Sequence, residues 1–275
     1  MLYRLHIPEP PLSELVELMW FSDDYIVPHA LERVLPTGDM SLIINLYEDR
    51  TRIYDRNEHA DCKTLDGSIV VGAYSEFTII DTAEQRSTIG AVFKPGGAVP
   101  FFGLPASELQ DTDLSLEMLW GAEASYLRER LLQARTPEAK FAVLEGVLLA
   151  RMAKPFASAH PAVHFAVGSF RRLPNRAISS VTDQIGLSDR RFIQLFARQV
   201  GLTPKLYCRV QRFQKVLRHI AGSSECIDWT QIALSCGYFD QAHFIHDFRA
   251  FSGINPSSYI ANKTQFQNHV VLVKP

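Results

Sequence analysis

Residues 232–259 read IALSCGYFDQAHFIHDFRAFSGINPSSY, and the second part of this stretch repeats a pattern found 52 residues earlier. Two phenylalanines, a glycine, a proline and a tyrosine recur at intervals of four, five, three and three residues. They are Phe192, Phe196, Gly201, Pro204 and Tyr207 in the first copy and Phe244, Phe248, Gly253, Pro256 and Tyr259 in the second. Agreement at all five points indicates an internal structural repeat.

Each residue type in the repeat suits a helix that stops and restarts. Two phenylalanines four residues apart lie on one face of a helix and can dock into a small core. A glycine five residues later suits the left-handed position that ends a helix. Thr203-Pro204 and Asn255-Pro256 then supply an N-cap followed by proline at the first helical position.

A shorter apolar helix that ends in glycine is predicted before each Phe pair. It carries Ile178, Val181 and Ile185 before Gly186 in the first copy, and Trp229, Ile232 and Ala233 before Gly237 in the second. Ser188 and Asp240 can cap the helices that follow. A short helix, a glycine-containing turn and a second helix with exposed polar side chains form the helix-turn-helix layout.

One longer helix, 204–221, is predicted between the two copies. Its inward stripe repeats at three- and four-residue steps and consists of Leu206, Val210, Phe213, Leu217 and Ile220. Such a helix would hold the two units at a fixed separation. Their second helices could then enter successive major-groove turns on one side of a DNA duplex, roughly 34 Å apart.

The segment from about 165 to 261 resembles the AraC/XylS-type DNA-binding domain, in which one helix joins two helix-turn-helix units. In the second unit, the Ile-Ala, Gly-aromatic, Asp-Gln, His-Phe, Phe-Arg, Gly and Pro-x-x-Tyr elements all fall in register with that family. The first unit departs at Thr182, where the family usually has an alanine packed between the two helices. The added hydroxyl either loosens this contact or bonds to the backbone, and we expect the fold to survive.

The resemblance implies that side chains pointing away from each Phe pair read the DNA. These are Arg190, Ile193 and Gln194, flanked by Arg191 and Arg198, in the first unit, and Gln241, His243, Ile245 and His246, with Arg249 near the DNA backbone, in the second. Arginine suits guanine and glutamine suits adenine. Arg198 and Arg249 equally suit phosphate contacts or simple solvation, and His243 equally suits packing at the helix start.

The charge distribution separates the two halves of the chain. Residues 165–262 contain twelve Arg or Lys against six Asp or Glu, although the whole chain has a net charge of −2. The half before residue 165 is therefore acidic in balance. This asymmetry indicates that only the back half meets a polyanion.

The front half is predicted to be β-rich and then helical. Short strands such as 41–45, 68–71 and 88–93 are bounded by Gly, Pro, Asp or Asn. From 114 to about 153, residues such as Leu127 and Leu131 recur at helical steps, so we expect one or two helices. The stretches LPTGDMSLIINL (35–46) and FKPGGAVPFFGLPASELQD (93–111) resemble the regulatory domain of one AraC-type subgroup, a cupin-like barrel followed by helices.

The predicted architecture is thus α+β with three parts. Residues 1–158 form a cupin-like β-barrel regulatory domain with C-terminal helices, and 159–262 form an all-α domain of two helix-turn-helix units joined by a helix. Residues 263–275 are a tail.

No catalytic, cofactor or metal residues are predicted. The chain shows no nucleophile paired with a base and no paired carboxylates at an interpretable spacing. Before its helices the front half has only His6, His29 and His59, too few for a metal-binding barrel. The four cysteines lack a Cys-x-x-Cys pair and are interpreted as buried side chains. Without an apolar run of membrane length or a secretory signal, we expect a cytoplasmic protein with no membrane partner.

The sequence predicts a sequence-specific transcription regulator, activator or repressor, whose principal partner is double-stranded DNA. In one hypothesis a small-molecule effector or a partner at the front domain controls DNA binding. In the alternative the barrel is only structural or dimerising, with no effector. If the helices of 114–153 form a dimer interface, a second copy of the chain is a partner. If the protein activates transcription, RNA polymerase is a partner as well. An enzyme with an appended DNA-binding domain is the least supported alternative.

Overall fold

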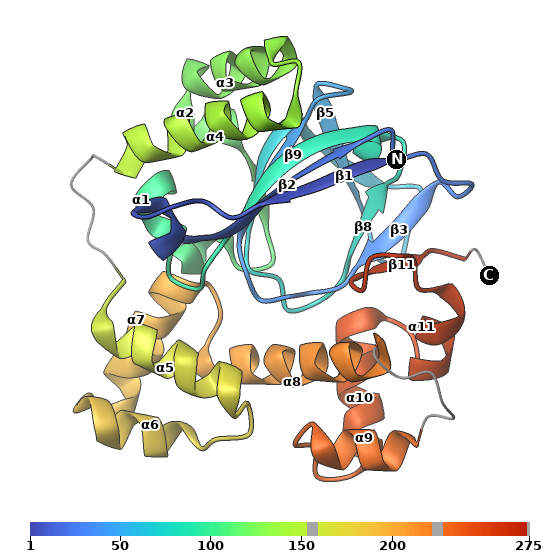
Figure 1. The fold of residues 1–275 in the computed structure, drawn as a ribbon. Coiled ribbons are helices and arrows are strands. Elements are labelled where there is room, and N and C mark those ends of the chain that lie inside the picture. Colours follow the sequence, from blue (N-terminus) through green and yellow to red (C-terminus); the bar gives the residue numbers. More distant parts are fainter. Residues whose placement is uncertain (153–158, 222–227, 274–275) are drawn as a thin grey trace.

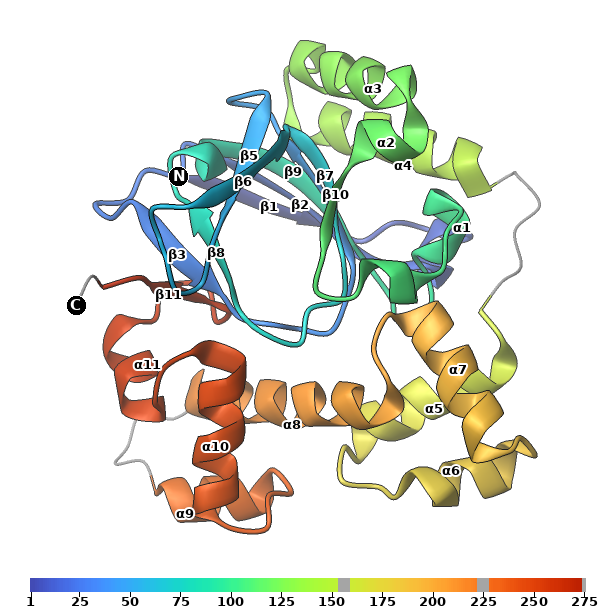
Figure 2. The same ribbon diagram turned by 180° about the vertical axis from the view of Figure 1, so that it is seen from behind.

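The computed structural model describes residues 1–152, 159–221 and 228–273, which form a β-rich N-terminal part and a helical C-terminal part (Figure 1, Figure 2). The predicted fold class, a β-domain with following helices and then an all-α domain, is confirmed. The predicted boundary between residues 158 and 159 falls at the edge of 153–158, outside the described residues.

Within the described residues, the strands form two antiparallel sheets instead of one closed ring. The first sheet has the order β1 (Leu2–His6), β2 (Val16–Asp23), β9 (Ser87–Phe93), β4 (Ser41–Asn45), β7 (Ser68–Val71) and β10 (Asp113–Ser115). The second has the order β11 (His269–Val271), β3 (Leu31–Val34), β8 (Thr78–Asp81), β5 (Arg50–Tyr54) and β6 (Cys62–Asp66). Strands β4 and β7 have the predicted bounds, and β9 begins one residue earlier than predicted.

The centre of the first sheet is shaped by a glycine opposite a tryptophan. Gly90 on β9 pairs with Trp20 on β2 and with Ile43 on β4. A Cβ atom at position 90 would lie 2.1 Å from the Trp20 ring. The indole therefore occupies the space that any side chain at position 90 would need.

The second sheet includes the tail of the chain. Strand β11 pairs antiparallel with β3, with His269 opposite Val34. Glu32 on β3 is fully buried and accepts hydrogen bonds from Tyr25 Oη (2.6 Å), His29 Nε2 (2.6 Å) and His269 Nδ1 (2.7 Å). Burial alone would raise the pKa of Glu32, but these three hydrogen bonds outweigh it and lower the pKa to about 2. An ionised carboxylate thus holds the tail to the β-domain.

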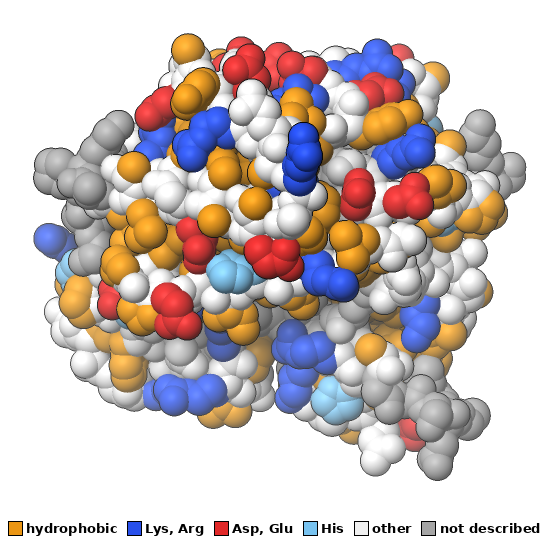
Figure 3. Space-filling model, turned by 45° about the horizontal axis from the view of Figure 1, so that its top comes forward, with side chains coloured by type: hydrophobic (Ala, Val, Ile, Leu, Met, Phe, Trp, Pro, Cys, Tyr) orange, Lys and Arg blue, Asp and Glu red, His pale blue; other side chains and the backbone are white. Residues whose placement is uncertain are grey.

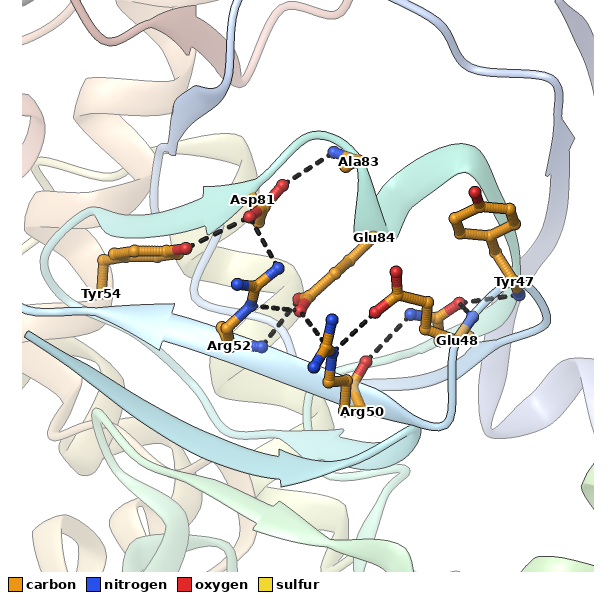
Figure 4. Close-up of polar contacts among 9 residues, drawn as sticks. Tyr47, Glu48, Arg50, Arg52, Tyr54, Asp81, Ala83 and Glu84 are labelled. Atoms are coloured by element: carbon orange, nitrogen blue, oxygen red, sulfur yellow. Dashed lines mark hydrogen bonds and ion pairs between the residues drawn. The ribbon is translucent and has the colours of Figure 1, made fainter.

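A second polar cluster fastens β5 to β8 and to the short helix η2 (Glu84–Arg86) (Figure 4). The fully buried Glu84 carboxylate accepts from Arg52 Nε at 2.6 Å and from the Arg52 backbone N–H at 2.7 Å. Arg52 Nη2 also lies 2.9 Å from Asp81 Oδ2, which accepts from Tyr54 Oη. Because each carboxylate here is paired, we interpret the cluster as structural.

Helices cover one side of the first sheet (Figure 1). They are α1 (Val99–Phe102), α2 (Leu116–Trp120), α3 (Ala122–Gln133) and α4 (Pro137–Met152), with η1 (Leu12–Glu14) and η3 (Ala106–Leu109) nearby in the core. The predicted helical stretch from 114 thus begins with a short strand and contains three helices. Leu127 and Leu131 are buried, as expected of residues that cover the sheet.

The described residues of the C-terminal part are almost entirely helical. In order the helices are α5 (Pro161–Arg172), α6 (Ile178–Ile185), α7 (Asp189–Val200), α8 (Pro204–Ala221), α9 (Trp229–Ser235), α10 (Gln241–Ser252) and α11 (Pro256–Asn262). Asp240 and Asn255 cap α10 and α11 with their side chains, as predicted. Ser188 holds the N-cap position of α7 but makes no side-chain capping bond.

Among the helices that the structure describes, none has the length and apolar character needed to cross a lipid bilayer. On the face of the molecule seen in Figure 3, acidic, basic and apolar side chains are interspersed.

Candidate nucleic-acid interface

The five-point sequence repeat is also a repeat of aromatic packing. In the first unit the Phe196 ring lies 5.6 Å from both Phe192 and Tyr207. In the second unit the matching centroid distances are 5.7 Å for Phe244–Phe248 and 5.8 Å for Phe248–Tyr259. All six rings are buried. The Phe196–Tyr207 and Phe248–Tyr259 pairs each join the Phe-bearing helix to the helix that follows it, so the two units share one core design.

Each helix-turn-helix unit consists of a short helix and a longer recognition helix. The units are α6–α7 and α9–α10, separated by α8 (Figure 2). Gly186 and Gly237, in the turns, have φ values of +66° and +88°. This left-handed conformation favours glycine and lets the chain reverse between the two helices.

Thr182 joins the two helices of the first unit instead of loosening them. Its side chain is buried, and its hydroxyl donates to Asp189 Oδ1 at 2.7 Å, at the start of α7. The hydroxyl also lies 3.0 Å from the Ser179 carbonyl oxygen. A polar contact thus replaces the packing expected of alanine at this position.

In the first unit, the structure places all five proposed DNA-reading residues on exposed positions of one recognition helix. Arg190, Arg191, Ile193, Gln194 and Arg198 all lie on α7 and are exposed. Phe192 and Phe196 fill the opposite, buried face. The first unit therefore presents three guanidinium groups and one amide to solvent.

In the second unit, only some of the five proposed residues are exposed to solvent. His243, His246 and Arg249 are exposed on α10, whereas Gln241 and Ile245 are half-buried. Gln241 Oε1 accepts from the Thr230 hydroxyl, and Ile245 packs against the core. His243, His246 and Arg249 are thus the proposed residues of this helix that are open to solvent.

A buried carboxylate on α10 holds the second unit to α8. Asp247 is 2% exposed, and its Oδ1 accepts from Arg209 Nη2 at 2.7 Å. Arg212 Nη2, also on α8, lies 3.9 Å from Oδ2, and the rings of His243 and His246 lie 3.8 Å from the carboxylate. Asp247 could not be recognised from the sequence as a paired carboxylate, because Arg209 and Arg212 lie far from it in the chain.

Helices α5 and α8 also bind the loop between β3 and β4. The side-chain amides of Gln211 and Gln214 donate to the carbonyl oxygens of Thr37 (3.0 Å) and Pro36 (2.8 Å). Arg171 Nη2 on α5 lies 3.4 Å from Asp39 Oδ1. Burial raises the pKa of Asp39 to about 6 although the Arg171 charge opposes that rise.

The segment between β7 and β8, residues 72–77, contacts both units at equivalent positions of the repeat. A Cβ atom on Gly201 would lie 2.8 Å from Ala73 Cβ, and one on Gly253 would lie 2.5 Å from the Phe77 ring. Both glycines end recognition helices with positive φ. Each recognition helix therefore directs its C-terminal end at the β-domain, and its first half lies farther away (Figure 1, Figure 2).

A cavity of about 530 Å³ lies between the two sheets of the β-domain. Its wall includes Trp20, Tyr74 and Asp113 from the β-strands and their connections, and Phe266 and His269 from the tail. The β3–β4 loop and the 72–77 segment, which hold the helical domain, also contribute to this wall. Two segments of the β-domain thus line the cavity and also contact the helical domain.

The described residues contain no group of His, Cys, Asp or Glu side chains arranged to hold a metal ion. Cys208 and Cys236 are buried, as predicted, whereas Cys62 is exposed on β6, contrary to that interpretation. Cys226 lies outside the described residues.

Two family matches cover separate parts of the chain. Residues 181–262 match the family described as "Helix-turn-helix domain", and residues 4–115 match a "Domain of unknown function (DUF6597)". The helical domain is therefore a helix-turn-helix domain of the AraC type, in agreement with the resemblance of the sequence to AraC/XylS regulators. The protein is a DNA-binding transcription regulator.

Solved structures with a similar fold share little sequence with this chain. A crystal structure of ToxT from Vibrio cholerae O395 has 9% identity and a TM-score of 0.44, covering 94% of this chain and 97% of that one. ToxT bound to (E)-4-(8-methylnaphthalen-1-yl)but-3-enoic acid has 8% identity and a TM-score of 0.46, covering 94% and 98%. No curated protein matches the chain.

Neutralising the buried carboxylate of the second unit will destabilise the protein. In Asp247→Asn, Arg209 and Arg212 lose their counter-charge, so we expect the free energy of unfolding to fall by about 2 kcal/mol, measured by urea denaturation. Asp183→Asn, at an exposed position of α6, is the matched control and should change it by less than about 0.5 kcal/mol. Equal effects of the two substitutions would contradict a structural role for the Asp247 ion pair.

Proposed function

We propose that the protein reads two successive major-groove segments of double-stranded DNA with helices α7 and α10. The observation that carries this proposal is the matched orientation of the two helices. Gly201 and Gly253 end both helices against one segment of the β-domain, so the first halves of both helices face away from it. In helix-turn-helix proteins the N-terminal residues of the recognition helix contact the base edges.

The two recognition helices offer different chemistry to DNA. Arg190, Arg191 and Arg198 on α7 can neutralise phosphates or pair with guanine, and Gln194 can pair with adenine. On α10, His243 and His246 supply imidazole donors and acceptors, and Arg249 supplies the only guanidinium group among the proposed DNA-reading residues of this helix. We therefore assign most of the salt-dependent affinity to the first unit.

We further propose that a small-molecule effector in the β-domain cavity controls DNA binding. A volume of about 530 Å³ falls within the range of ligand pockets, roughly 300–1,000 Å³. The β3–β4 loop lines the cavity and also accepts hydrogen bonds from Gln211 and Gln214 on α8. A ligand that moves this loop would thus act on the helix between the two units. The alternative, a purely structural barrel, is less favoured because side chains leave this space open.

A homodimer is a further proposal, and it places the interface on the helices that cover the first sheet. Met118, Tyr126 and Leu132 are exposed there, although Leu127 and Leu131 are buried. Sedimentation of the full chain should show a dimer that Tyr126→Lys weakens. A wild-type monomer at every concentration tested would contradict it.

If the protein activates transcription, RNA polymerase is an additional partner.

The salt dependence of DNA binding tests the division of labour between the units. On a DNA site selected from a random library, Arg190→Ala should reduce the slope of log K against log[salt] by about 1, because one phosphate-neutralising charge is lost. His246→Ala should weaken binding to that site while leaving the slope unchanged.

Arg135→Ala removes the same charge from an exposed position of the β-domain and should alter neither quantity. Equal losses of affinity with equal salt slopes for Arg190→Ala and His246→Ala would refute the assignment.

A further inference from the structure

The charge of the cavity wall restricts which ligand the cavity can hold. Among the described residues that line it, Asp39 and Asp113 are acidic and none is Lys or Arg. His269, the basic side chain that does line it, is already bonded to Glu32, so an anionic ligand would lose its hydration without gaining an unpaired cationic partner. Aromatic side chains also line the cavity, among them Trp20, Tyr3 and Phe266. The faces of such rings attract cations.

Asp113 differs from Asp39 in having unused hydrogen-bonding capacity. It is 4% exposed, and its Oδ2 accepts from Tyr74 Oη at 2.7 Å. Its Oδ1 has no hydrogen-bond partner among the described residues. The nearby Lys63 Nζ donates to the backbone carbonyl of Asp113 and not to its carboxylate. Asp39, by contrast, is already paired with Arg171.

A buried carboxylate with one unsatisfied oxygen is costly unless a donor reaches it. Burial raises the pKa of Asp113 to about 6, while the hydrogen bond from Tyr74 and the charge of Lys63 oppose the rise. An ammonium group would supply both the missing donors and the missing counter-charge.

We propose that the cavity binds an organic amine, with an aromatic or branched apolar body against the sheets and its ammonium group donating to Asp113. This inference rests on the effector role proposed above and names the ligand class for that site. The contact with Asp113 would also connect the ligand to the helix-turn-helix units. Tyr74, the partner of Asp113, lies in the segment 72–77, whose Ala73 and Phe77 adjoin Gly201 and Gly253.

Three probes with one apolar body test the proposal on the full chain: 4-phenylbutylamine, 4-phenylbutanol and 4-phenylbutyrate. At about pH 7 the amine is protonated and the acid is ionised. Calorimetric titration should show the amine binding at least about tenfold more tightly than the acid, with the alcohol between them. The amine should raise the melting temperature more than the alcohol or the acid does, because it binds the folded state most tightly.

Asp113→Asn keeps the acceptor for Tyr74 and removes the charge. It should weaken amine binding about tenfold or more while changing alcohol binding less than about twofold. Asp61→Asn, at an exposed position, is the matched control and should bind all probes as the wild type does. Ile43→Trp, which fills the cavity, should abolish binding of every probe.

Acid binding as tight as amine binding, amine binding unaffected by Asp113→Asn, or no binding of any probe would each overturn the amine assignment. The effector role is judged separately, by DNA affinity with and without bound probe. An amine that binds through Asp113 but leaves DNA affinity unchanged would contradict the effector role and support the ligand class. An acid that binds and alters DNA affinity would do the reverse.

Discussion

The arrangement of the helical domain depends on how helix α8 is held. At one side the buried Asp247 carboxylate binds Arg209 and fixes α8 to the second recognition helix. At the other side Gln211 and Gln214 donate to backbone carbonyl oxygens of the β3–β4 loop. A net hydrogen bond contributes only about 1 kcal/mol, but a buried carboxylate left without its partner costs about 3–5 kcal/mol. The Arg209–Asp247 ion pair is therefore the stronger constraint on α8. The hydrogen bonds from the Gln211 and Gln214 amides are weaker and are broken more easily.

This difference in strength suggests where regulation acts. Arg209 and Asp247 both belong to the helical domain and keep the second unit attached to α8. The contacts to Pro36 and Thr37 cross between domains, and the same loop lines the β-domain cavity. A ligand shifts an equilibrium only by its differential affinity for the two states. A small molecule that moves the loop must also break the Arg171–Asp39 ion pair, but both partners of that pair are partly exposed, unlike Asp247.

The sequence alone predicted the parts of the fold that depend on local pattern. The aromatic repeat, the glycine turns and the Asp240 cap follow from spacings within a few residues, and the structure confirms them. What it could not predict are contacts between residues far apart in sequence. The Arg209–Asp247 pair and the Tyr74–Asp113 hydrogen bond are of this kind. Strand β11 was not predicted, because a three-residue strand in a polar tail has almost no hydrophobic periodicity. The proposed DNA-reading residues remain a prediction.

The proposed function depends on the fixed spacing at which α8 holds the two proposed DNA-reading helices. The most direct test of this spacing is the affinity of the full chain for a selected DNA site. That affinity is compared with the affinity for the same site carrying about five extra base pairs, half a helical turn, between the two segments that the protein contacts. We expect the insertion to lower affinity about 100-fold or more, toward that of nonspecific DNA, because the second helix then faces the wrong side of the duplex. Affinity for the two sites that agrees within about threefold would contradict it.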